Sequence, residues 1–128
     1  MHEDEFQINL IIKKRGMITM DIANTEKVSN TLERIEKELD MLGLWKIQRP
    51  NISKFDSETP FCMDSMNFHE WLQFVLIERF REMIKDNQQL PTGCKIFPYA
   101  AELYRNQLGQ YKGLLQALYD FDKLFNDN

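Results

Sequence analysis

The chain has 128 residues, a length typical of one domain, and a chain of this size buries roughly two-thirds of the surface of its unfolded state. Hydrophobic residues make up 43% and charged residues 28%, which excludes a disordered chain and predicts a packed core. The 16 Lys and Arg against 20 Asp and Glu give a formal net charge of −4. Because domains that bind nucleic acid on their own usually carry a basic surplus, we expect no autonomous binding of RNA or DNA.

Three features indicate a cytoplasmic protein without membrane contact. Cys62 and Cys94 are too few for a disulfide framework and lack the close spacing of a CxxC site. The longest apolar run, residues 74–77, is far shorter than the ~20 residues of a membrane-spanning helix. The basic cluster at residues 13–15 follows an apolar stretch, which is the reverse of the order in a secretory signal.

A first helix is predicted from about residue 25 to 42. Apolar side chains recur there at alternating steps of four and three, the period of one helix face. These are Val28, Leu32, Ile35, Leu39 and Leu42. Asn24 or Thr25 can cap the start, and Gly43 is a suitable C-terminal stop.

Residues 43–66 contain two prolines and several Asn, Ser and Asp, with no sustained helical period. They also carry Trp45, Phe55 and Phe61, which a solvated linker would not need. A loop of this length is uncommon in a small domain unless it packs or functions. We therefore expect an ordered loop that folds over the bundle.

The second predicted helix begins at a capping box formed by Asn67 and Glu70 and ends near Asp86. Its apolar residues cover most of the helical circumference, which predicts a central position in the fold. A turn at residues 89–93 follows, and Pro98 suits the first turn of a short third helix that ends near residue 106.

Gly109 separates this third helix from the last one, whose apolar residues again keep a spacing of three or four. The predicted fold is therefore all-α, a small four-helix bundle with a long ordered loop between the first two helices. Residues 21–128 form the bundle domain, and residues 1–20 form an N-terminal extension that we expect to be disordered. Phe6 to Ile12 would allow a short strand, but no partner strand is evident.

No catalytic or metal-binding motif stands out. The residues that could assemble a metal site have a spacing that matches no established pattern: Cys62, Asp64, His69 and Glu70. With His2 and His69 as the only histidines, a nucleophile beside a base is poorly supported. Helical carboxylates leave acid–base chemistry open, although most such groups are solvated. We expect no metal, no cofactor and no catalytic residue.

Arg79 is placed unusually, on a helical stripe of apolar residues: Phe68, Leu72 and Val75. It should therefore be partly buried and paired, because an uncompensated buried charge costs several kcal/mol. Glu82 and Asp122 are the candidate partners. A structural bridge is the favoured interpretation, and a ligand-binding role is the alternative.

The block from Phe55 to Arg79, FDSETPFCMDSMNFHEWLQFVLIER, resembles the signature of the YqcC-like family of small bacterial proteins. Leu90-Pro91 and Pro98-Tyr99 extend the resemblance, which covers about residues 21–126. It implies a small all-helical bundle of gammaproteobacteria whose gene commonly neighbours that of tRNA pseudouridine synthase C. The family has no assigned catalytic residues. Residues 1–19 depart from the family pattern, which an upstream start-codon assignment would explain.

By this resemblance the chain is expected to be a noncatalytic module that binds or assists tRNA pseudouridine synthase C. The alternative is a small-molecule-binding protein or minor enzyme with a site between the second helix and the 45–66 loop, using Asp64, Glu70 and Arg79. The oligomeric state is left open. The candidate residues for a partner surface or pocket are Trp45, Phe55, Pro60, Phe61, Asp64, Glu70, Trp71 and Arg79.

Deletion of residues 1–19 is expected to leave the melting temperature nearly unchanged, because the first predicted helix and its cap come after them. Thermal unfolding of the full and truncated chains measures this. A large drop on truncation would show that the segment docks into the fold.

Overall fold

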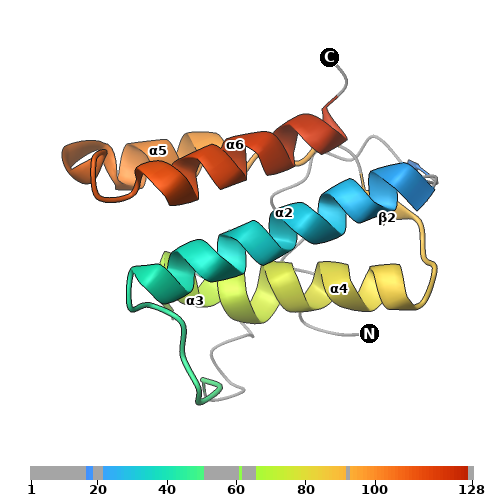
Figure 1. The fold of residues 1–128 in the computed structure, drawn as a ribbon, viewed down its shortest axis with the longest axis horizontal. Coiled ribbons are helices and arrows are strands. Elements are labelled where there is room, and N and C mark those ends of the chain that lie inside the picture. Colours follow the sequence, from blue (N-terminus) through green and yellow to red (C-terminus); the bar gives the residue numbers. More distant parts are fainter. Residues whose placement is uncertain (1–16, 19–21, 51–60, 62–65, 92, 127–128) are drawn as a thin grey trace.

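The computed structural model describes residues 17–18, 22–50, 61, 66–91 and 93–126. Within these residues the chain forms four helices, which confirms the predicted all-α bundle (Figure 1). They are α2 (Ile22–Met41), a central helix made of α3 (Phe68–Trp71), η3 (Leu72–Ile77) and α4 (Glu78–Lys85), then α5 (Phe97–Leu103) and α6 (Lys112–Phe125). A 3-10 turn, η4 (Arg105–Gln107), lies between α5 and α6.

The central helix begins at the predicted capping box. The backbone N–H of Asn67 donates to the Glu70 carboxylate at 2.9 Å, which satisfies a group left unpaired at a helix start. Its middle part, η3, is π-helical, and every residue from 71 to 77 is buried. The helix ends where Asn87 turns to a φ of 55° and the N–H of Gln88 reaches back to the carbonyl of Met83 at 2.9 Å.

α2 begins three residues before its predicted start, at Ile22 rather than residue 25. The prediction that Asn24 or Thr25 caps this helix is therefore wrong, because a residue inside a helix cannot occupy its N-cap position. The predicted stop is confirmed. Gly43 has a φ of +75°, and the N–H of Leu44 donates to the carbonyl of Leu39 at 2.8 Å.

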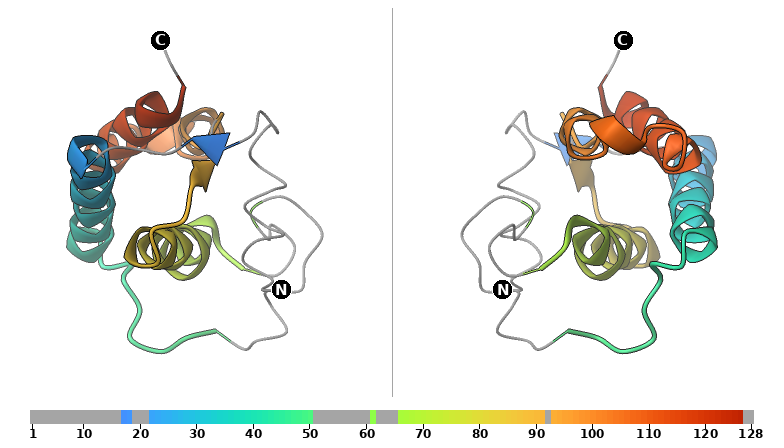
Figure 2. Two further views of the ribbon diagram at one scale, coloured as in Figure 1. Left: turned by 90° about the vertical axis from the view of Figure 1, so that its right-hand side faces the viewer. Right: turned by 90° about the vertical axis from the view of Figure 1, so that its left-hand side faces the viewer.

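The core lies between α2, the central helix and α6. Viewed end-on, α2 occupies one side of the bundle, α5 and α6 lie above, and the central helix lies below (Figure 2). The predicted stripe of α2 faces inward, with Val28, Leu32, Ile35 and Leu39 fully buried. Trp71, Phe80 and Phe121 are the largest fully buried side chains, so apolar burial is the main stabilising term.

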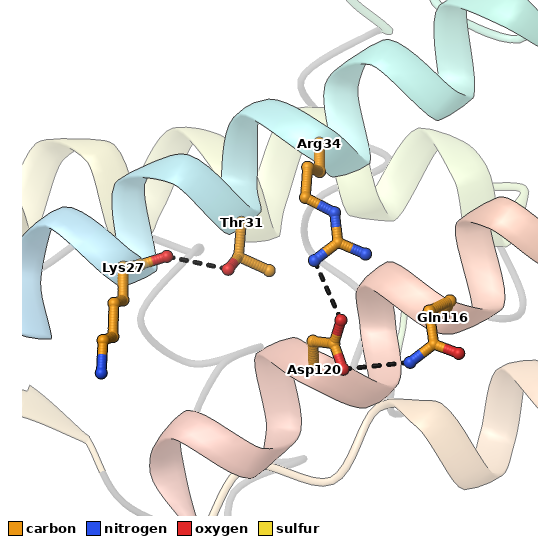
Figure 3. A network of polar contacts seen from close by, with 5 residues as sticks. All are labelled: Lys27, Thr31, Arg34, Gln116 and Asp120. Carbon is orange, nitrogen blue, oxygen red and sulfur yellow. Dashed lines mark hydrogen bonds and ion pairs between the residues drawn. The ribbon is translucent and has the colours of Figure 1, made fainter.

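Polar side chains join α2 to α6 along the outside of the bundle (Figure 3). Arg34 pairs with Asp120 at 2.9 Å, and Gln116 donates to the same carboxylate at 3.1 Å. Because these groups are largely exposed, the pair fixes the register of the two helices more than it stabilises them. The helices pass closely at Gly113, where an added Cβ would collide with the Glu38 carboxylate.

A two-residue strand pair adds to the helices. β1 (Met17–Ile18) pairs antiparallel with β2 (Leu90–Pro91). Two residues of the N-terminal extension thus have backbone groups that pair with the segment after α4. The predicted strand at residues 6–12 lies outside the described residues. The deletion of residues 1–19 should accordingly be compared with one of residues 1–16, which retains β1.

Two buried charged residues have different partners. Arg79 is 7% exposed, and its guanidinium lies 2.7 Å from the Glu82 carboxylate. Glu82 is one of the two partners predicted from the sequence. Asp122 is not its partner, since the Asp122 Oδ2 atom accepts hydrogen bonds from the backbone N–H groups of Ile96 and Phe97 at 2.8 and 2.7 Å. The Asp122 side chain, on α6, thus caps the N-terminus of α5.

No helix in the described part of the chain is long and apolar enough to cross a membrane.

Substitutions at Arg79 test whether its packing or its charge matters more. We expect Arg79→Met to unfold near the wild-type temperature, because Met fills the volume and Glu82 is half exposed and can be solvated. Arg79→Ala should cost about 2 kcal/mol, because it leaves a void. Equal destabilisation by both variants would contradict this, and chemical denaturation measures the difference.

Asp122 should make folding stability fall as pH rises through acidic values. Burial raises the pKa of Asp122 from 3.8 to about 6, against the opposing effect of the Phe97 and Ile96 N–H groups and Lys95. A raised carboxyl pKa means that the folded state binds the proton more tightly, so this contribution, on the order of 3 kcal/mol, is lost between about pH 4 and 6.

Denaturation of wild type and Asp122→Asn from pH 4 to 7 checks this expectation. The variant should gain stability relative to wild type as the pH rises, because Asn keeps an acceptor for the α5 N–H groups but does not titrate. Parallel pH profiles of the two proteins would contradict it. Asp122→Ala serves as the comparison that removes the cap at every pH.

Candidate functional site

The residues predicted to form a partner surface or pocket are mostly buried in the structure. Trp71 is fully buried, Phe61, Glu70 and Arg79 are each 7% exposed, and Trp45 is partly buried against the core. The rings of Phe61 and Trp71 fill the interior beside the central helix, so these two residues leave little side-chain surface exposed. The other three predicted residues, Phe55, Pro60 and Asp64, lie outside the described residues.

Phe61 joins an aromatic cluster built from three parts of the chain. Its ring stacks on the Tyr99 ring, with the two centroids 4.3 Å apart, and lies edge-on to the Trp71 ring at a centroid distance of 5.0 Å. The centroid of the Phe68 ring lies 5.2 Å from that of Tyr99 and 6.2 Å from that of Tyr104. Phe61 has a φ of 62°, a conformation that L-residues rarely adopt, so these contacts hold it against local backbone strain.

A pocket of about 350 Å³ lies beside this cluster. Its walls come from Phe61 and Met66, from residues 67–69 at the start of the central helix, and from α5 and η4 through Tyr99, Leu103, Tyr104 and Gln107. Its lining combines aromatic and aliphatic side chains with a few polar ones, a composition typical of binding sites that orient a ligand by a few hydrogen bonds. Of the predicted partner-surface or pocket residues that the structure describes, only Phe61 lines this pocket.

The titratable groups among the described residues that line the pocket, His69, Tyr99 and Tyr104, are neutral near pH 7. Burial lowers the pKa of His69 below 6.5, an effect that Glu70 opposes and Lys46 reinforces. Burial raises the pKa of Tyr99, and it raises that of Tyr104 to about 12, with Tyr111 and Tyr99 contributing. Neutral imidazole and phenol groups can donate and accept hydrogen bonds, so the pocket is suited to uncharged ligand groups.

Glu70 instead holds the chain after α2 in place. The pKa of Glu70 lies below its usual value: burial raises it, but the Asn67 N–H and Lys46 together outweigh burial. The Lys46 ammonium lies 3.1 Å from the Glu70 carboxylate. The Gln73 side chain exchanges two hydrogen bonds with the backbone of Lys46, at 2.7 and 2.9 Å. Arg49 pairs with Glu78 at 2.6 Å, so this segment is anchored along one face of the central helix.

The described residues contain no group of three or more His, Cys, Asp or Glu able to hold a metal ion. Two of the four residues considered for such a site, Cys62 and Asp64, lie outside the described residues. Cys94 is a buried free thiol, and burial together with Asp122 raises its pKa well above 9.0, so it stays protonated and unreactive.

The part of the pocket that sequence reasoning missed comes from α5 and η4. Tyr99, Leu103 and Gln107 recur at steps of four, which is the signal that they share one side of a helical segment. Their role could not be read from that spacing alone, because the residues facing them, such as Phe61 and His69, are more than 25 positions away in the sequence.

The fold has a close counterpart among solved structures. The solution NMR structure of protein YqcC from Escherichia coli superposes with a TM-score of 0.73 at 31% identity, covering 83% of this chain and 91% of that one. The sequence of YqcC from strain K12 is 32% identical over 103 residues, 80% of this chain and 94% of that protein. A protein of Haemophilus influenzae is 33% identical over 97 residues, 76% of this chain and 91% of its own length.

The family model described as "DUF446: tRNA pseudouridine synthase C" matches residues 27–124, most of the chain. This chain belongs to the YqcC family. A segment within a larger protein is also similar to this chain. The tRNA pseudouridine synthase C of Pectobacterium carotovorum is 30% identical over 70 residues, which are 55% of this chain and only 19% of that protein.

Proposed function

We propose that this chain is a noncatalytic cytoplasmic module that binds tRNA pseudouridine synthase C and assists its action on tRNA. The observation that carries the proposal is the relative from Pectobacterium, in which a segment similar to this chain is part of a protein named tRNA pseudouridine synthase C. The match occupies 19% of that protein, so roughly four-fifths of it lies beyond the part related to this chain.

In that relative the segment similar to this chain and the rest of the synthase are on one polypeptide, which keeps them close together. Two units on one polypeptide meet at an effective concentration in the millimolar range, whereas separate chains must supply that proximity through binding energy. If the module assists the synthase in the linked protein, a separately encoded module needs a binding surface to do the same.

Charge supports a protein partner over RNA. The chain carries a net charge of −4, whereas binding to the phosphate backbone requires Lys and Arg that replace its counterions. An enzyme that acts on tRNA needs a positive surface, and an acidic module is attracted to such a protein. The proposed complex should therefore form more slowly and weakly at high salt.

The pocket favours a second candidate, a small-molecule-binding protein. Its volume of about 350 Å³ lies at the lower end of the range for ligand sites. Of the three residues first considered for such a site, Glu70 and Arg79 are engaged elsewhere and are not among the described residues that line the pocket, and Asp64 lies outside the described residues. A metabolite that raises the melting temperature of the isolated chain would support this candidate.

The proposed function is tested by measuring pseudouridine formation with the chain alone, with the synthase from the same genome alone, and with both across salt concentrations. We expect no modification by the chain alone and a higher rate or tighter tRNA binding in the mixture, with the gain shrinking as salt rises. A covalent fusion of the two proteins is the matched control. It should keep the gain on dilution, while the separate proteins lose it.

Two outcomes would contradict the proposal. Modification of tRNA by the chain alone would show that it is an enzyme in its own right. Identical synthase rates in every mixture, together with no detectable complex by analytical ultracentrifugation, would show that it is not a partner.

A further inference from the structure

The pocket beside the aromatic cluster is lined by residues from the end of α5, from η4 and from the start of the central helix. Figure 1 shows that α5 ends and the central helix begins at the same end of the bundle. Leu103 lines it and is 48% exposed, and Leu108, which follows the pocket residue Gln107, is 53% exposed. Large apolar side chains with this much exposure cost little in a free monomer but gain free energy when a partner covers them. This end therefore combines a hollow with a large exposed apolar side chain, Leu103, in its wall.

The walls of the pocket are fixed before anything binds. Tyr99 is held by its stacking on Phe61 at 4.3 Å, and Tyr104 is stacked on Tyr111 at 3.9 Å. Rings locked in this way lose little conformational entropy when the pocket is filled, so the site is preorganised. Fixed aromatic walls also favour a planar or bulky apolar group, which can make offset or edge-to-face contacts with them.

Charge decides between the two kinds of macromolecule that could supply such a group. An unstacked nucleobase could lie between aromatic rings, but nucleic acid binding takes most of its free energy from basic side chains that contact phosphate. None of the described residues that line the pocket carries a positive charge at pH 7, and the chain as a whole is acidic. A side chain of a protein partner fits these conditions.

We infer that this pocket receives an apolar, preferably aromatic, side chain of tRNA pseudouridine synthase C. The inference rests on the proposed function and adds the position of the interface. Leu103 packs against the inserted side chain, and the His69 imidazole and the Gln107 amide at the pocket wall hydrogen-bond to the partner's backbone. Buried aromatic anchors of this kind supply most of the free energy of many interfaces.

The test is a titration of the synthase with three forms of the chain: wild type, Leu103→Arg and Tyr119→Arg. Tyr119 is a matched control, because it is 44% exposed, lies on α6 against Phe97 and does not line the pocket. Both variants change the net charge equally. Leu103→Arg should weaken binding by about tenfold or more, whereas Tyr119→Arg should stay within about twofold of wild type.

A second variant guards against a folding defect. Gln107 is exposed in the free protein, so Gln107→Trp can fill the pocket mouth without disturbing the core. It should weaken binding as Leu103→Arg does while its melting temperature stays near that of wild type. Hydrogen exchange of the complex should slow at residues 66–69 and 97–107 and remain unchanged in the second half of α6.

The outcomes separate the two proposals. If wild type binds the synthase and both pocket variants bind equally well, the inference is overturned and the proposed function stands. If wild type does not bind the synthase, the proposed function fails, and so does the inference that a synthase side chain fills the pocket. If tRNA alone binds wild type and Leu103→Arg abolishes that binding, the pocket recognises a nucleobase and the assignment to a protein side chain is wrong.

Discussion

Burial of the central helix is the constraint on which the rest of the structure depends. Every residue from 71 to 77 is buried, so no face of this part of the helix is left for solvent. A helix that is apolar on all sides must be covered on all sides. α2 and α6 cover part of it, and the segment after α2 runs along another face, so the path of the chain follows from one buried helix.

The same burial explains where the polar interactions lie. Gln73 is 5% exposed within the π-helical part of the central helix, and its amide needs partners because an unpaired buried polar group is costly. The backbone of Lys46 supplies both hydrogen bonds. A segment without regular structure is thereby fixed by the requirements of the helix beneath it. Loops anchored in this way can hold functional groups in place.

Local signals could be read from the sequence, whereas contacts between distant segments could not. The stripe of α2, the stop at Gly43 and the capping box at Asn67 depend on residues a few positions apart, and the structure confirms them. Asp122 caps the start of α5 from 25 or 26 positions away. The pocket was missed for the same reason, because Phe61, His69 and Leu103 converge only after the helices pack.

The π-helical part of the central helix has a consequence for how family members compare. A π turn accommodates one more residue than the α-helical turn it replaces, and one residue corresponds to a rotation of about 100° around the helix axis. Removing a single residue from Leu72–Ile77 could therefore restore a regular helix while the capping box and α4 each keep their inward faces. The loss of one residue is thus tolerable at this position, even though it lies in the middle of the core.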